Sequence, residues 1–87
     1  MAMTLDSLPI GQQACITAVD WSSLAGEEGQ RLRALGIDVG AKVAVAHRGI
    51  FAGADPLAII IGRMTVALRR VHANAMTVVA TEQVEAA

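Results

Sequence analysis

Few side chains in this chain could bind a metal ion or act as a nucleophile, and those few lie far apart. Cys15 is the only cysteine, and His47 and His72 are the only histidines among the 87 residues. No CxxC or HxxxH pair brings two of them to the close spacing that zinc sites use. We therefore expect no metal site and no cofactor, with His47 and His72 as weak candidates for ligands.

The same side chains give no sign of catalysis. Cys15 lies in an apolar stretch, which is typical of an inert buried thiol rather than of a nucleophile. His47 continues the alternating pattern of Val43 and Val45, so we expect it to be a partly buried packing residue. No GxxxxGK[ST] phosphate-binding motif occurs. The sequence predicts a protein that is not an enzyme, and a single cysteine suits the reducing cytoplasm.

The basic residues are concentrated in the middle of the chain. All seven lie between Arg31 and Arg70, where only Asp38 and Asp55 are acidic, so this segment carries about +5 while the whole chain carries −1. Such a segment could meet an acidic partner, although solvated outward positions are the simpler interpretation. One tryptophan, one phenylalanine and no tyrosine leave no stacking platform, so we expect no nucleic-acid partner.

The longest irregular segment, 48–56, holds the best candidate for docking. Ile50 and Phe51 stand between two glycines, and Phe51 is the only phenylalanine. We expect an apolar anchor formed by Ile50 and Phe51, with Arg48 and Arg63 as surrounding charges. The alternative, that Phe51 folds back to plug one end of the core, remains open.

Two glycines are expected to end the helix that precedes this part of the chain and to turn the chain into the next strand. Leu32 and Leu35 lie on one face of a helix expected from about residue 25 or 27 to 35, and Ser22 or Ser23 would cap its start. Gly36 is expected to end the helix in a Schellman motif with Ile37 folded back on Leu32, and Gly40 closes a second turn.

Alternating apolar residues predict five short strands in a barrel that is closed or partly open. Gly62 and Arg63 are expected to form a tight hairpin, with Met64, Val66 and Leu68 on one buried face.

No run approaches the roughly 20 apolar residues that span a bilayer, so we expect no membrane insertion. We expect a single domain, 1–87, with a frayed tail at 82–87. The strands are expected at 13–19, from 42 onward, at 57–61, at 64–68 and at 76–81, with the one helix between the first two and a short connector at 69–74.

An ordered set of motifs resembles the ferrous iron transport protein A (FeoA) family. The helix end reads RLxxLGxxxG, from Arg31 to Gly40, and is followed by the Asp55-Pro56 pair and by the ALRR motif at 67–70. The resemblance implies a mainly β, SH3-like barrel with no catalytic residues. It also implies a cytosolic accessory role in bacterial ferrous iron uptake, with the GTP-binding region of a FeoB-type transporter as partner.

A second class of protein stays open beside this one. The C-terminal domain of iron-dependent transcriptional repressors resembles the same barrel and binds a transition metal or another protein. These 87 residues contain no segment expected to form DNA-binding helices, which argues against a repressor. Whether the chain forms a homodimer through an open sheet edge is also left open.

Overall fold

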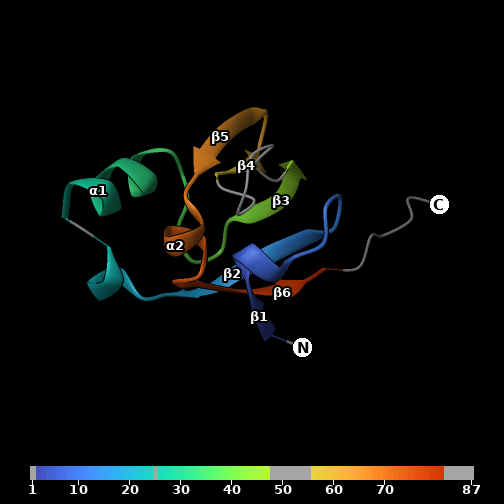
Figure 1. Ribbon diagram of the computed structural model, residues 1–87, viewed down its shortest axis with the longest axis horizontal. Helices are drawn as coiled ribbons and strands as arrows, with labels where there is room; N and C mark the ends of the chain where they lie inside the picture. The colour runs from blue at the N-terminus through green and yellow to red at the C-terminus, as the bar shows by residue number, and fades with distance from the viewer. Residues whose placement is uncertain (1, 25, 48–55, 82–87) are drawn as a thin grey trace.

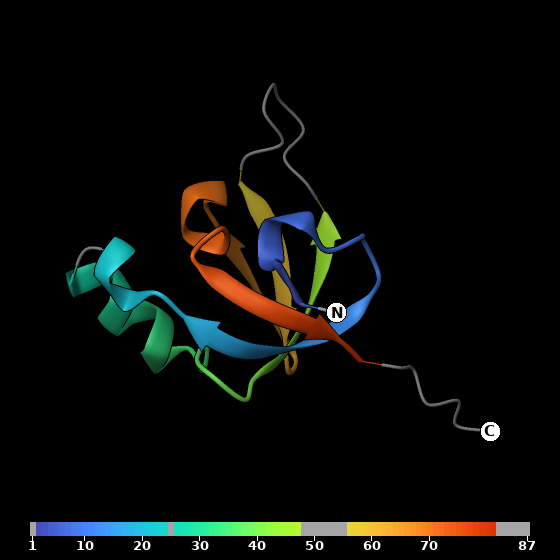
Figure 2. The same ribbon diagram turned by 90° about the horizontal axis from the view of Figure 1, so that it is seen from below.

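A computed structural model describes residues 2–24, 26–47 and 56–81 of the chain. Its strands form one antiparallel sheet with the order β1-β6-β2-β3-β4-β5. The sheet curls around its core (Figures 1 and 2). The six strands are β1 (Ala2–Thr4), β2 (Gln13–Val19), β3 (Lys42–His47), β4 (Leu57–Ile61), β5 (Met64–Leu68) and β6 (Met76–Ala80).

Short helices fill the connections between the strands. The longest, α1 (Gly26–Ala34), lies between β2 and β3 at the side of the barrel (Figure 2). α2 (Arg70–Ala73) links β5 to β6, and two 3₁₀ turns, η1 (Leu5–Ser7) and η2 (Trp21–Ser23), precede β2 and α1. In the described part of the chain, none of these helices has the length and apolar character needed to cross a membrane.

The core is built by the inward positions of the alternating strands. Val43 and Val45 of β3 are buried while Lys42, the first residue of the same strand, is exposed, as a period of two requires. Leu32 of α1 is also fully buried, so the helix is held by packing although its two glycines disfavour it. Among the described residues the buried set contains no polar or charged side chain.

The end of α1 confirms the predicted Schellman motif. Gly36 takes a φ of +95°, and its N–H donates to the carbonyl of Arg33 at 2.9 Å. The N–H of Ile37 donates to the carbonyl of Leu32, also at 2.9 Å, and both side chains are fully buried. This pair of bonds defines the motif and turns the chain from the helix toward the sheet. Gly40 also has a positive φ, +94°, in the following turn.

The hairpin prediction is confirmed in the backbone and wrong for one side chain. Gly62 has a φ of +62°, and Ile61 pairs with Met64 across the two-residue turn. Val66 and Leu68 are buried as expected, but Met64 is 43% exposed. Met64 lies beside the turn on the outermost strand of the sheet, where no further strand of the described chain covers it.

Two further predictions about the elements are wrong. The prediction of five strands missed β1, whose three residues pair with β6 at the other end of the chain. A segment this short carries no readable period. Among the described residues, the hydroxyls of Ser22 and Ser23 bond to Asp20 instead of to α1: both donate to its carboxylate, at 2.5 and 2.8 Å. These bonds lower the pKa of Asp20.

Candidate functional site

The predicted docking anchor falls on a part of the chain that the structure does not describe. Arg48, Ile50 and Phe51 all lie outside the described residues. Arg63, the fourth member of the set, lies exposed in the β4–β5 turn. The anchor therefore stays a prediction, and only its Arg63 is placed.

The two histidines and the cysteine lie in different surroundings. His47 is exposed at the end of β3, so its predicted packing role is wrong, because a register shift between Val45 and His47 interrupts the β3–β4 ladder. Cys15 is half-buried rather than buried, since its neighbours Ala14 and Ile16 occupy the inward positions. The described residues hold no group of three or more His, Cys, Asp or Glu side chains that could bind a metal ion.

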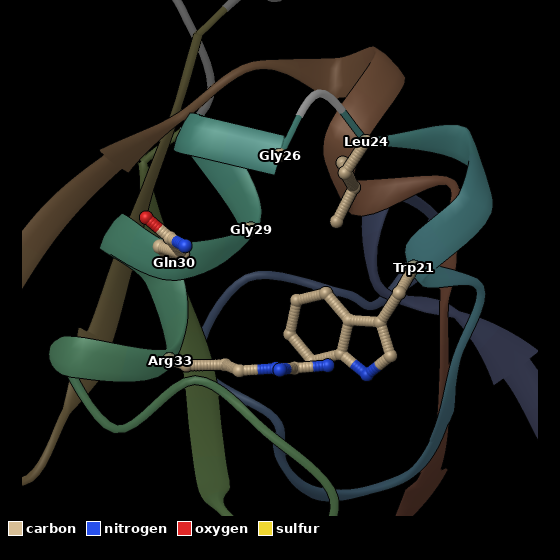
Figure 3. Close-up of a pocket in the computed structure, with 6 residues that line it drawn as sticks. All are labelled: Trp21, Leu24, Gly26, Gly29, Gln30 and Arg33. Carbon is tan, nitrogen blue, oxygen red and sulfur yellow. The ribbon is translucent and has the colours of Figure 1, made fainter.

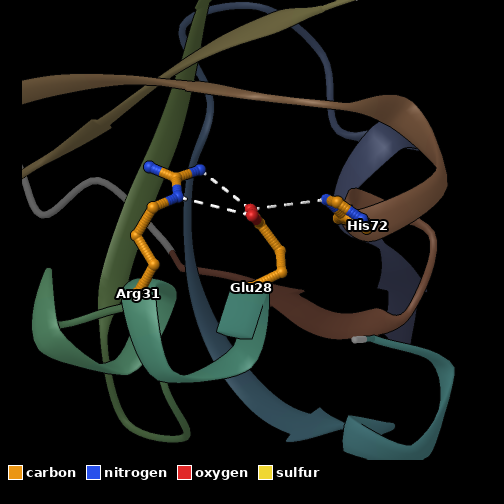
Figure 4. A network of polar contacts seen from close by, with 3 residues as sticks. All are labelled: Glu28, Arg31 and His72. Atoms are coloured by element: carbon orange, nitrogen blue, oxygen red, sulfur yellow. Dashed lines mark hydrogen bonds and ion pairs between the residues drawn. The ribbon is translucent and has the colours of Figure 1, made fainter. Parts of the chain in front are cut away.

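His72 instead takes part in a polar cluster that joins α1 to α2 (Figure 4). Nη2 of Arg31 lies 2.8 Å from Oε2 of Glu28, and Nδ1 of His72 lies 3.6 Å from the same oxygen. The Arg31 hydrogen bond lowers the pKa of Glu28, helped by the charges of Arg31, His72 and Arg69 and opposed by partial burial. Glu28 therefore carries its negative charge between α1 and α2, two helices that lie far apart along the chain.

A tryptophan of η2 and an arginine of α1 form the second cluster, where these two elements meet (Figure 3). The guanidinium carbon of Arg33 lies 4.1 Å from the centre of the Trp21 ring, an attraction worth about 0.5–1 kcal/mol at an exposed site. The indole lies against Gly29, where an added Cβ would be 3.4 Å from Trp21 Cε3. A pocket of about 240 Å³ opens here, lined by Trp21, Leu24, Gly26, Gly29, Gln30 and Arg33.

Sequence reasoning missed both clusters. Neither Trp21 nor Glu28 is among the candidate site residues that the sequence indicates. One signal was present: a glycine inside a helical pattern weakens the helix and can have a packing reason, and Gly29 is such a residue. Its partner could not be read from the sequence, because the contact depends on how η2 folds back on α1.

These arrangements suit binding better than catalysis. The Glu28 carboxylate is engaged by Arg31 and His72, while Arg33 and Trp21 present a charge and an aromatic face at the surface. Guanidinium groups and aromatic rings are the side chains that most often carry binding energy at protein interfaces.

Comparison with known proteins identifies the family of this chain. The FeoA domain model matches residues 3–80. A FeoA protein from Chlorobium tepidum is 30% identical; the match covers 97% of this chain and 75% of that one, with a TM-score of 0.76. FeoA from Stenotrophomonas maltophilia, solved as a complex with zinc and described as an SH3 domain protein, is 31% identical. The match covers 91% of this chain and 89% of that one, with a TM-score of 0.68.

A more distant likeness concerns the fold alone. IdeR from T. acidophilum has a TM-score of 0.74 at 14% identity, and the match covers 92% of this chain but 34% of that one. No curated protein sequence matches the chain significantly. The family model spans most of the chain, and two FeoA proteins of solved structure share about 30% identity with it. The chain therefore belongs to the FeoA domain family and has its mainly β, SH3-like fold.

Proposed function

We propose that this chain is a non-enzymatic, cytoplasmic accessory module of bacterial ferrous iron uptake. Its partner in this proposal is the cytosolic GTP-binding region of a FeoB-type iron transporter. The observation that carries the proposal is the family match over residues 3–80. The Stenotrophomonas relative adds support, because it is described as "possibly acting as a bacterial ferrous iron transport activating factor".

The described side chains are consistent with an adaptor. The groups that could act on a substrate are dispersed: His47 ends β3, Cys15 lies in β2, and His72 faces a carboxylate on α1. Two exposed features are of the kinds that bind proteins: Arg33 stacked on Trp21, and the edge strand β5, whose residues Met64–Leu68 carry no charge. A module of this kind acts by holding its partner in one conformation, without chemistry of its own.

Co-purification tests the proposal. The full-length chain carrying an affinity tag is mixed with the transporter's purified cytosolic region in three states: without nucleotide, with GDP and with a GTP analogue that is not hydrolysed. We expect the two proteins to elute together in at least one state, in a buffer that contains Mg²⁺ for the nucleotide but no added iron or zinc. A folded chain that elutes alone in all three states contradicts the proposal.

The repressor-like alternative predicts a different result. A chain acting like the C-terminal domain of an iron-dependent repressor would bind a transition metal or a protein other than the transporter. Metal analysis of the purified chain separates the two functions, because a stoichiometric metal without transporter binding favours the alternative.

A further inference from the structure

β5 is an unusually open edge of the sheet. It is the last strand in the sheet order and pairs only with β4 among the described residues. Edge strands normally resist pairing with other chains through a charge, a proline, a bulge or short length. The five residues Met64–Leu68 contain no charge or proline, and their register with β4 runs over five pairs without a shift.

The hairpin geometry determines which backbone groups face outward. A two-residue turn makes Ile61 and Met64 a hydrogen-bonded pair, and bonded and non-bonded pairs then alternate along the ladder. Val66 therefore directs its N–H and carbonyl toward β4, while Thr65 and Ala67 direct theirs away from it. Thr65 and Ala67 are both exposed, and no strand of the described chain lies beyond β5 to pair with their two donors and two acceptors. Figure 1 shows β5 at the outer side of the sheet.

The charges beside this edge favour one kind of partner. Arg63 precedes the strand and Arg69 follows it, and both are exposed. Arg69 is close enough to Glu28 to help lower the pKa of that carboxyl, so Arg63 is the less compensated of the two cations. An added strand with an acidic residue at each end would place one carboxylate near each arginine.

The same charges disfavour a second copy of this chain. Two β5 strands paired antiparallel, in the register that joins Thr65 of one copy to Ala67 of the other, place Arg63 of each copy opposite Arg69 of the other. Like charges directly opposite each other destabilise a strand pair. An uncharged edge with basic ends thus fits a different chain better than its own.

We propose that the open edge of β5 binds an extended segment of a partner protein, uncharged in its middle and acidic at both ends, as a seventh strand of the sheet. Backbone hydrogen bonds to Thr65 and Ala67 supply the affinity, and Arg63 and Arg69 select the acidic ends. This inference adds a surface and a ligand chemistry to the proposed function. Its test uses no transporter, so the two proposals can fail separately.

The probe is a peptide of sequence ETVTVTE with both ends blocked, titrated into the full-length ¹⁵N-labelled chain. We expect it to perturb the amide signals of Thr65 and Ala67 and to slow their hydrogen exchange. A matched peptide with lysine in place of both glutamates is expected to bind about tenfold more weakly, since two charge pairs are lost. The variant Arg63→Glu should reduce this preference, whereas Lys42→Glu on β3 should not.

Two changes remove the backbone contacts themselves. Ala67→Pro deletes an outward N–H, which an edge strand tolerates, and Ala67→Ser is its matched control with the N–H retained. Methylation of the two valine nitrogens of the peptide removes the reciprocal donors without altering the protein. We expect the proline variant and the methylated peptide each to weaken binding about tenfold or more, and Ala67→Ser to bind normally.

Three results would overturn the inference. The first is that the peptide, at millimolar concentration, leaves the amide signals of Thr65 and Ala67 unperturbed. The second is that the methylated and unmethylated peptides bind equally well. The third is self-association of the free chain that Ala67→Pro abolishes, because it would assign the edge to a second copy.

Discussion

Replacing Gly36 by alanine tests how α1 is joined to the sheet. At a φ of +95°, a residue with a Cβ is disfavoured by roughly 1–2 kcal/mol. Steric contact adds little, because the new Cβ would lie 3.5 Å from Ile61 Cδ1, an ordinary van der Waals distance. We therefore expect Gly36→Ala to lower the free energy of unfolding by about 1–2 kcal/mol, mainly through backbone strain.

The sole tryptophan provides the assay, because Trp21 packs beside α1. Urea unfolding followed by its fluorescence should give a lower midpoint for Gly36→Ala, and the melting temperature should fall by about 4 °C or more. Gly26→Ala is the matched control: it adds the same methyl group at the start of the same helix, where no other atom lies within 4 Å. If both variants unfold at the same midpoint, the Schellman motif does not contribute as argued.

Four further predictions concern stability and metal binding. Gly62→Val should destabilise the protein by more than about 1 kcal/mol, because valine is strained at a φ of +62°; an unchanged denaturation midpoint would contradict the hairpin account. Gly29→Ala should raise the melting temperature, since alanine gains up to about 1 kcal/mol of helix propensity and its Cβ would meet Trp21 at ordinary contact distance; a lower value would mean that the indole has no room for a methyl group. Folding lowers the pKa of Glu28, so its ionised carboxylate stabilises the folded state at pH values above the unfolded-state pKa. This stabilisation is lost as the pH falls through the folded-state pKa. Acid titration from about pH 6 to pH 3 should therefore destabilise the wild type more than Glu28→Gln, and parallel curves would refute this. Calorimetry under anaerobic conditions should detect no submicromolar Fe(II) site; a one-to-one site abolished by His47→Ala would overturn that expectation.

The parts of the fold that the sequence predicted well are the locally encoded ones. The bounds of β2, β4 and β5 agree with the prediction, because an alternating or continuously apolar run of five or more residues between turn signals indicates a strand without knowledge of its partner. The Schellman motif was readable for the same reason, since Leu32, Gly36 and Ile37 lie within one turn of each other.

The missed features depend on contacts between distant segments. β1 exists as a strand because β6 pairs with it, and its three residues carry no pattern of their own. His47 is exposed because the irregularity in the β3–β4 ladder changes which positions face the core, and a bulge leaves no mark in an alternating sequence.

In the candidate site, too, the features that depend on contacts between distant segments could not be predicted from the sequence. Arg63 was singled out from its place in the charged middle of the chain, and the structure puts it in an exposed turn beside the β5 edge. The contact of Glu28 with His72 and that of Trp21 with Arg33 arise only when helices and turns pack together. Residue types alone therefore indicated a binding module but not the surfaces it presents.

The central claim is that this chain acts by binding the transporter rather than by chemistry. Isothermal titration of the full-length chain into the transporter's cytosolic region, with GDP and with the GTP analogue in turn, tests it most directly. We predict saturable one-to-one binding that depends on the bound nucleotide and that persists, in the presence of Mg²⁺, without added iron or zinc. The absence of binding in every nucleotide state, from a chain whose thermal melt shows that it is folded, would contradict it.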